Sequence, residues 1–413
     1  MTSPLRLSQT TFLSDQAPSL FADALITDAS FELRFVDDAG INWRSTTQAK
    51  RISKTQAHND ILEALLVSIA PDVQDLKAYL QTARSPYGRP HFRNPAAPRS
   101  IRLSIKSPAI SAEFALTQWP IAPNTLIEDI DEGAIVGRLF VPPEIINPSP
   151  IIMVAGSGGG IEQTIAPVLS AHGRPVLSLA LFNYPGRPKH HHAIPIDDIA
   201  AAAHMLLDRF SANRTSIAGV SRGAEAAILT GIHFPDIIDR VAAIVPSNVV
   251  TAGFSPEHGP DVPAWSVNKE PLPYVPAPAD AVEIDEACTD IFSFRDAYSL
   301  LFRNPKAQAD AGLPVGDLHC PLLLAGAGDD QLWPSDVGAE LLAAKANTEQ
   351  TTTKIYPGAG HLLAPTNTPT ALSSLVCHPV DKQFLNVGGT PQTQAIANKR
   401  FWYDFTQFMG RMD

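Results

Sequence analysis

Three residues of this chain, Ser221, Asp330 and His361, have the side-chain types of a nucleophile, an orienting acid and a general base. A serine hydroxyl is a weak nucleophile at neutral pH, so an imidazole must take its proton. A carboxylate must then fix the tautomer of that imidazole and stabilise the imidazolium. Together these types indicate acyl chemistry that passes through a covalent serine intermediate.

The surroundings of Ser221 indicate a nucleophile elbow. The sequence Gly219-Val220-Ser221-Arg222-Gly223 lies between a β-branched run at 215–218 and a helix-forming run at 224–229. A strand, a sharp turn at serine and a helix place the hydroxyl above the sheet, at the positive end of the helix. Glycine is needed on both sides, because a Cβ there would collide with the neighbouring strand and helix.

The acid and the base follow later strands. The run 321–328 is a buried apolar strand that ends in glycine before Asp329 and Asp330, and His361 follows the strand and glycine turn of 354–360. The order serine, acid, histidine is that of α/β-hydrolases, whose sites lie at the C-terminal edge of the sheet. We favour Asp330 as the acid, because it stands four residues before Pro334, which opens the next helix. Asp329 is the rival, and we expect it either to cap the helix at Ser335 or to bind backbone amides.

A glycine-rich loop provides a candidate oxyanion hole. The strand 151–155 is followed by Gly156-Ser157-Gly158-Gly159-Gly160 and a predicted helix from Ile161. We expect the N–H groups of Gly158 and Gly159 to act with that of Arg222, the residue after the nucleophile. A phosphate-binding loop is the alternative, but no Lys-Ser/Thr follows the glycines and they do not fit GxGxxG.

The elements that must position these residues form two predicted domains. From residue 126 to 413, strands alternate with helices, which predicts an α/β-hydrolase domain with a mostly parallel sheet. In residues 1–125 apolar and polar residues alternate, as at 31–36, 101–105 and 112–116, which predicts an N-terminal β-sandwich of Ig-like type. The segment 61–80 is expected to be partly helical.

One insertion interrupts the alternation of strands and helices. Residues 251–315 separate two sheet strands and begin with a proline-rich part. Long ordered insertions at this edge are often lids, so we expect a substrate cap. Its Trp265, Tyr274 and Phe292 either line an acyl pocket or belong to the core.

The histidine triplet His190-His191-His192 resembles a metal-binding tract, but no cysteine or carboxylate lies at ligand spacing. Consecutive side chains also point in different directions, so we interpret the triplet as a solvated loop. The last helix, from about Pro391, places Trp402, Phe405 and Met409 on one apolar face that is expected to pack on the sheet.

Composition excludes several functions. The 413 residues are 45% hydrophobic and 18% charged, and the net charge of −11 is spread without a basic patch, which argues against a nucleic-acid partner. The three cysteines, Cys288, Cys320 and Cys377, have no metal or disulfide spacing, which favours a reducing compartment. The first residues contain no signal-peptide pattern, and no run is long enough to span a membrane, so we expect a cytoplasmic protein. We expect no cofactor and no metal.

Several motifs together resemble those of a known family. They occur in order along the chain: Gly156–Glu162, Leu179–Tyr184, Gly219–Glu225, Gly328–Ser335, Tyr356–His361 and Gly388–Pro391. This set resembles the acyl-CoA thioesterase / bile acid-CoA:amino acid N-acyltransferase family over most of residues 133–413. Carried over by position, the resemblance implies Ser221 as nucleophile, His361 as base and Asp330 as third member. It also implies an acyl-CoA substrate.

The nucleophile bears on which reaction the resemblance implies. Members of the family hydrolyse the thioester or pass the acyl group to glycine or taurine, and the dedicated transferases carry cysteine at the elbow. Serine at position 221 therefore points to hydrolysis of an acyl-CoA or carrier-bound thioester. Transfer to an amine, a carboxylesterase or peptidase, and a non-catalytic binding module are the alternatives. Arg222 either meets a CoA phosphate or forms a salt bridge within the protein.

Overall fold

The computed structural model describes residues 4–54, 56–82, 97–278, 282–285, 288–378 and 382–410. Its largest sheet has eight strands in the order β23-β22-β15-β14-β11-β12-β10-β9. Strand β10 pairs antiparallel with β9 and β12, and the other neighbours are parallel, as predicted. In the sheet order the strands span Thr351–Tyr356, Leu322–Ala327, Ile238–Ile244, Thr215–Val220, Ile151–Val154, Val176–Leu179, Ile135–Val141 and Leu126–Glu132.

Each face of this sheet has its own apolar core because neighbouring residues of a strand point to opposite sides. In β11, Ile152 and Val154 pack with helices α4 and α5, whereas Ile151 and Met153 pack with α3 and α9. Helix α8 joins the first of these layers through Ala339. The five helices span Ile165–Ser170 (α3), Asp197–Phe210 (α4), Arg222–His233 (α5), Ser335–Ala343 (α8) and Pro391–Gly410 (α9).

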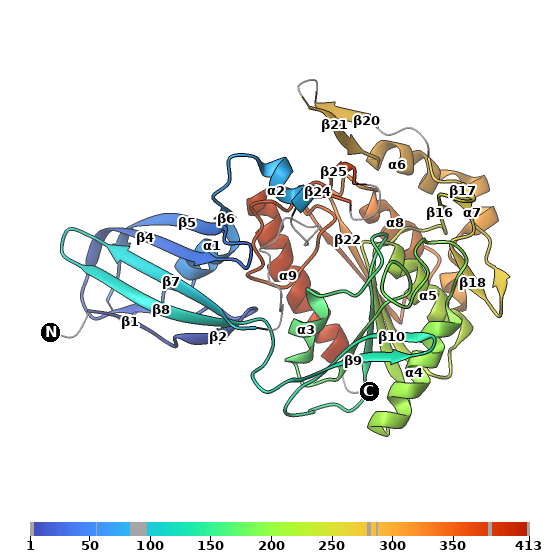
Figure 1. Cartoon of the computed structure of the whole chain (residues 1–413), viewed down its shortest axis with the longest axis horizontal. Helices are drawn as coiled ribbons and strands as arrows, with labels where there is room; N and C mark the ends of the chain where they lie inside the picture. The colour runs from blue at the N-terminus through green and yellow to red at the C-terminus, as the bar shows by residue number, and fades with distance from the viewer. Residues whose placement is uncertain are drawn as a thin grey trace.

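The N-terminal part is built on a separate six-stranded sheet, to the left in Figure 1. The strands lie in the order β2-β8-β7-β4-β5-β6 and span Thr11–Leu13, Ser111–Trp119, Arg99–Lys106, Ile26–Val36, Asn42–Ile52 and Ala70–Pro71. A two-stranded sheet of β1 (Leu5–Leu7) and β3 (Leu20–Ala22) and helices α1 (Asp60–Ser68) and α2 (Leu76–Thr82) complete it. The alternating pattern thus predicted strands correctly, but an Ig-like sandwich is not confirmed. The six-stranded sheet packs against the two-stranded sheet and helices, not against a second full sheet. Its strands β2 and β8 also pair in parallel.

Helix α9 joins the two parts. It packs under the eight-stranded sheet and also reaches the N-terminal part, where Trp402 Nε1 donates to Asp15 at 3.0 Å. Lys399 lies 2.7 Å from Glu63 of α1. Figure 1 shows α9 running beside the eight-stranded sheet. These two contacts link the N-terminal part to α9 and, through α9, to the eight-stranded sheet.

The insertion after β15 consists of short strands and helices. Strands β16 to β21 span Gly253–Ser255, Gly259–Val262, Trp265–Val267, Glu270–Pro271, Val282–Asp285 and Cys288–Ser293. Helices α6 (Arg295–Arg303) and α7 (Pro305–Ala311) and a 3-10 turn at Val315–Asp317 follow. Strand β18 pairs with β13 (Ile194–Pro195), and β21 pairs with β25 (Phe384–Asn386) beside β24 (Leu375–Cys377). Among the described residues, no helix combines the length and apolar character needed to cross a membrane.

One helix begins later than predicted. The helix expected from Ile161 starts at Ile165, because residues 156–164 continue as a loop. The carboxylate of Glu162 accepts backbone N–H groups of Thr164 at 2.9 Å and Ile165 at 2.6 Å, so it caps the N-terminus of α3.

Candidate active site

The turn at Ser221 has the geometry of an elbow. Ser221 has φ 58° and ψ −119° between β14 and α5, and its N–H donates to Ile244 O at 2.8 Å. A Cβ added to Gly219 would lie 1.9 Å from the carbonyl oxygen of Gly223. A Cβ added to Gly223 would lie 2.5 Å from Ala155 O. The steric reason predicted for the glycines is therefore confirmed, since no side chain fits at either position.

Asp330 and His361 form a buried pair. Nδ1 of His361 lies 2.8 Å from Oδ2 of Asp330, whose side chain is fully buried. The same Oδ2 accepts from Ser335 Oγ at 2.6 Å. The other carboxylate oxygen accepts the backbone N–H groups of Leu332 at 3.0 Å and Trp333 at 3.3 Å. Both carboxylate oxygens of Asp330 therefore accept hydrogen bonds, which fix the carboxylate in the position that orients the imidazole.

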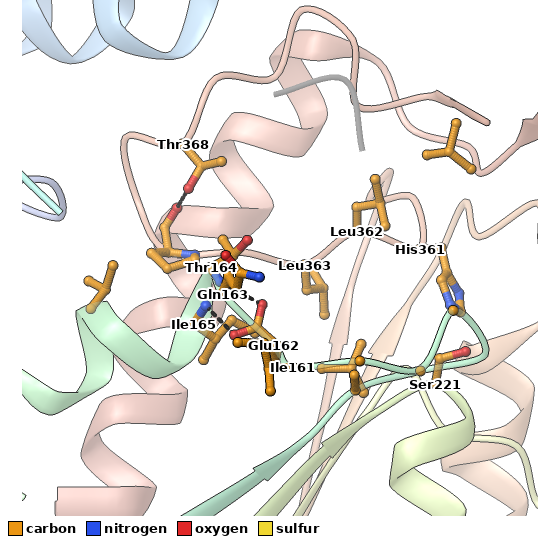
Figure 2. Close-up of a pocket in the computed structure, with 18 of the residues that line it drawn as sticks. Ile161, Glu162, Gln163, Thr164, Ile165, Ser221, His361, Leu362, Leu363 and Thr368 are labelled. Carbon is orange, nitrogen blue, oxygen red and sulfur yellow. Dashed lines mark hydrogen bonds between the residues drawn. The ribbon is translucent and has the colours of Figure 1, made fainter. Parts of the chain in front are cut away.

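The opposite side of the imidazole faces the nucleophile. Figure 2 shows the ring of His361 directly over Ser221, and both residues line one pocket of about 690 Å³. Trp333 packs edge-on against the ring, with centroids 5.7 Å apart. Among the described residues, neither Ser221 Oγ nor His361 Nε2 has a hydrogen-bond partner. Both atoms are therefore available to each other and to a bound substrate.

The neighbouring acid, Asp329, has structural partners. Its Oδ1 accepts from Gln331 Nε2 at 2.9 Å, and its Oδ2 accepts the backbone N–H of Gly389 at 3.0 Å. It thus binds a backbone amide, as expected, while Asp330 is the acid that contacts the histidine.

The glycine-rich loop lies against the elbow, but it does not offer every predicted donor. A Cβ on Gly156 would stand 3.1 Å from Ser221 Cβ, so this loop passes directly beside the nucleophile. The N–H of Gly159, however, donates to Gly156 O at 3.0 Å and closes a turn. Gly159 is therefore not a donor to an oxyanion in this structure. Gly158 and Arg222 stay candidates, and Arg222 opens α5, where its N–H has no acceptor within the helix.

Side chains outside the loop hold it in place. Asn183 Nδ2 donates to Gly158 O at 2.7 Å, and Gly160 N donates to Phe182 O at 2.7 Å. Ser157 Oγ lies 3.2 Å from Nε2 of His378, which also lines the pocket. His378 was not among the predicted site residues, because no local sequence pattern marks a contact between Ser157 and a residue so far along the chain.

The side chain of Arg222 is committed to the protein interior. Its guanidinium pairs with Glu225 at 2.8 Å and donates to Thr251 O at 2.6 Å. Glu225 is fully buried and also accepts from Ser247 Oγ and Trp265 Nε1, each at 2.9 Å. Of the two roles considered for Arg222, the internal salt bridge is thus correct. The Arg222 side chain is buried and does not line the pocket.

We expect Glu225→Ala to lower the free energy of unfolding by about 3 kcal/mol or more, because it leaves the buried guanidinium of Arg222 uncompensated. Urea denaturation of both proteins would measure the change. Glu128→Ala is the control, since Glu128 pairs with Arg209 on the surface and should cost about 0.5 kcal/mol or less. Equal losses in the two variants would contradict this assignment.

His191 does not lie in a solvated loop, as we had expected. Its ring stacks on Phe182 with centroids 4.6 Å apart and meets Trp265 edge-on at 4.3 Å. It is 8% exposed, and its Nε2 has no partner among the described residues. Burial, with the nearby charge of Arg222, holds the pKa of His191 well below its usual range. The expectation was wrong because the apolar partners come from distant segments.

This histidine should make stability depend on pH. Its folded-state pKa is depressed, so the unfolded chain binds the proton more readily. The stabilisation is fully present above the ordinary pKa of about 6.5 and is lost as the pH falls below it. Replacing it with phenylalanine should flatten the decline in melting temperature between about pH 6.5 and 5. A decline of unchanged slope in His191→Phe would contradict this.

The pocket wall differs from the predicted cap. None of the described residues of 251–315 lines the pocket that holds Ser221 and His361. Trp265 is fully buried beside α5, Phe292 packs on an apolar cluster around Val387, and Tyr274 lies at the edge of the core on the α4–α5 face. The insertion contacts the first turn of α5 through Thr251 and Trp265, and its role as a substrate cap stays a prediction. The N-terminal part contributes Ser14, Arg99, Gln118 and Pro120 to the wall of this pocket.

Comparison with known proteins places the chain among relatives of two activities. A family model described as "BAAT / Acyl-CoA thioester hydrolase C terminal" matches residues 200–412. The chain is 25% identical over 303 residues to acyl-coenzyme A amino acid N-acyltransferase 2 of Mus musculus, covering 72% of this chain and 68% of the relative. It is also 25% identical over 301 residues to mouse acyl-coenzyme A thioesterase 1, covering 70% and 65%.

Comparison with solved structures gives partial matches. The crystal structure of a hormone-sensitive lipase from a metagenome library matches with a TM-score of 0.42 at 14% identity, over 70% of this chain and 87% of that one.

Proposed function

We propose that this chain, which belongs to the BAAT / acyl-CoA thioester hydrolase family, hydrolyses acyl-CoA through an acyl-enzyme on Ser221. The observation that carries the proposal is the convergence of Ser221 with the buried Asp330–His361 pair on one pocket. The pocket volume of about 690 Å³ is of the size that holds a small-molecule ligand. Apolar side chains near the nucleophile, including Ile161, Leu362 and Leu363, suit an acyl chain.

The first half-reaction forms the acyl-enzyme. His361 Nε2 takes the proton of Ser221 as Oγ attacks the thioester carbonyl, and Asp330 stabilises the resulting imidazolium. The N–H of Arg222, with Gly158 of the loop, stabilises the negative charge on the carbonyl oxygen. The C–S bond then breaks, and His361 gives its proton to the leaving thiolate.

The second half-reaction releases the acid. A water molecule loses a proton to His361 and attacks the acyl carbon, and the Ser221–acyl bond breaks as the proton returns to Oγ. Serine at the elbow supports water as acceptor, because the dedicated transferases that this sequence resembles carry cysteine there. Glycine or taurine in place of water would give an N-acyl amino acid by the same sequence of steps.

The test uses the purified full chain and acyl-CoA thioesters of increasing chain length. Thiol release is followed with a thiol reagent, and the acyl products are identified by mass with and without glycine or taurine. The proposal predicts free acid as the main product under all conditions. N-acyl glycine or taurine as the main product would replace hydrolysis with transfer. Hydrolysis of acyl groups from acyl carrier protein but not from CoA would show that the substrate is a carrier-bound thioester.

A further inference from the structure

The outer wall of the candidate active-site pocket belongs to the N-terminal part of the chain. Ser14, Arg99, Gln118 and Pro120 line the same pocket as Ser221 and His361. Arg99 and Gln118 face each other as partners across strands β7 and β8. The substrate chamber is thus shared between two parts of the chain, and the apolar core of the N-terminal part also includes Cys377 and Phe384 of the C-terminal part.

Gln118 is a polar residue in an apolar position. Along β8 the alternate residues Ala112, Phe114 and Leu116 face the interior of the N-terminal part, and Gln118 is next on that face. It is only 4% exposed. Among the described residues, its side-chain amide has no hydrogen-bond partner. Its amide is not fully closed to solvent and lines the chamber, so a group from outside the chain can bond to it.

Ser14 presents a second such group on the same wall. Its hydroxyl oxygen is buried and has no hydrogen-bond partner among the described residues, while its backbone N–H donates to Trp119 O at 2.8 Å. Leaving a buried hydroxyl unpaired costs about 1–3 kcal/mol. A substrate group that bonds to both would recover this free energy on binding.

The remaining lining defines where such a group sits. The rest of the lining is mixed: it has apolar side chains such as Ile161, Leu363, Val376 and Leu385, and polar ones such as Glu162, Asn183, Thr368 and His378. Among the described lining residues, Arg99 is the one arginine or lysine. A single cation does not match the several phosphate charges of CoA, so this end of the chamber suits the acyl group. A chain whose carbonyl is at Ser221 would then end at Gln118 and Ser14.

We propose that Gln118 and Ser14 recognise a hydroxyl group at the distal end of the acyl chain, so that the preferred substrates are hydroxylated acyl thioesters. This inference rests on the proposed function. A side-chain amide both donates and accepts a hydrogen bond, as a hydroxyl does, whereas a carboxylate only accepts. A site built to bond a substrate hydroxyl discriminates against the analogue that lacks it, because its own polar groups are then left unpaired.

The kinetic test compares matched pairs of acyl-CoA thioesters, with and without an ω-hydroxyl, over a series of chain lengths. At the best length, kcat/KM should be on the order of tenfold higher for the hydroxylated partner. Gln118→Leu should bring this ratio close to one, and Ser14→Ala should reduce it in part. Gln48→Leu is the matched control, because Gln48 is exposed on β5 of the same sheet and should keep the wild-type ratio.

A binding measurement separates this inference from the proposed function. Calorimetry with the Ser221→Ala protein would compare ω-hydroxy and unsubstituted fatty acids, with no dependence on catalysis. Tighter binding of the hydroxy acid that is lost in Ser221→Ala/Gln118→Leu supports the inference even if no thioester is cleaved. Equal affinities at all lengths, or equal rates in the kinetic test, would overturn it. A preference for an ω-carboxylate that survives Gln118→Leu would also overturn it and assign recognition to Arg99. Melting temperatures check that each variant is folded.

Discussion

Ser221→Ala should lower kcat for thioester hydrolysis by about 10³-fold or more, because the bond-forming oxygen is removed while the binding pocket remains. The loss should appear in kcat with little change in KM. Stability should hardly change, since Ser221 Oγ has no hydrogen-bond partner among the described residues. Steady-state thiol release and a thermal melt measure both effects on the same sample.

Covalent labelling provides an independent check of the nucleophile. A fluorophosphonate probe should modify the wild-type chain at Ser221 and leave the alanine variant unlabelled. Near wild-type hydrolysis by purified Ser221→Ala would refute the acyl-enzyme. Failure to label the wild type would favour a binding module that keeps only the fold.

Asp330→Asn should lower kcat by about 10⁴-fold at neutral pH, as the equivalent change does in serine proteases. The amide removes the negative charge that stabilises the imidazolium and presents an N–H₂ group or a weaker acceptor to Nδ1 of His361. Since Asp330 also accepts from Ser335 and from the N–H of Leu332, a melt must accompany the rate measurement. The kinetic loss should exceed anything that a fall in folded fraction explains.

Asp329→Asn is the matched control, because it makes the same chemical change one residue away. Asp329 bonds Gln331 and the N–H of Gly389 and does not contact the histidine. Its substitution should change kcat by less than about tenfold, roughly the share of one hydrogen bond. If Asp329→Asn were the more damaging change, the acid would have to be reassigned.

The positions of these three side chains follow from local sequence and the rules of parallel sheets. Strands β14, β22 and β23 each end just before Ser221, Asp330 or His361, and their parallel pairing brings those ends to one edge. Glycines flank each turn, so the sequence indicated both the strand ends and the acid that contacts the histidine. Their catalytic roles stay predictions until the variants are measured.

What the sequence did not reveal depends on contacts between distant segments. The burial of His191 depends on Phe182 and Trp265, and the commitment of Arg222 depends on Glu225 and the backbone at 251–252. The N–H of Gly159 is taken by a turn within its own loop, which composition alone does not specify. One signal was present and unused: Gln118 interrupts an apolar alternation along β8, where a core residue is expected.

The shared chamber has a consequence for how substrate preference is inherited. The reacting groups follow the strands of one sheet, whereas the residues proposed to meet the end of the substrate lie on or beside another, whose apolar core also includes Cys377 and Phe384. Sequence drift or deliberate exchange in the first 120 or so residues can therefore alter which acids are released while the machinery of bond cleavage stays untouched. A chimaera that carries a relative's N-terminal sheet should show that relative's substrate preference and keep this chain's catalytic residues.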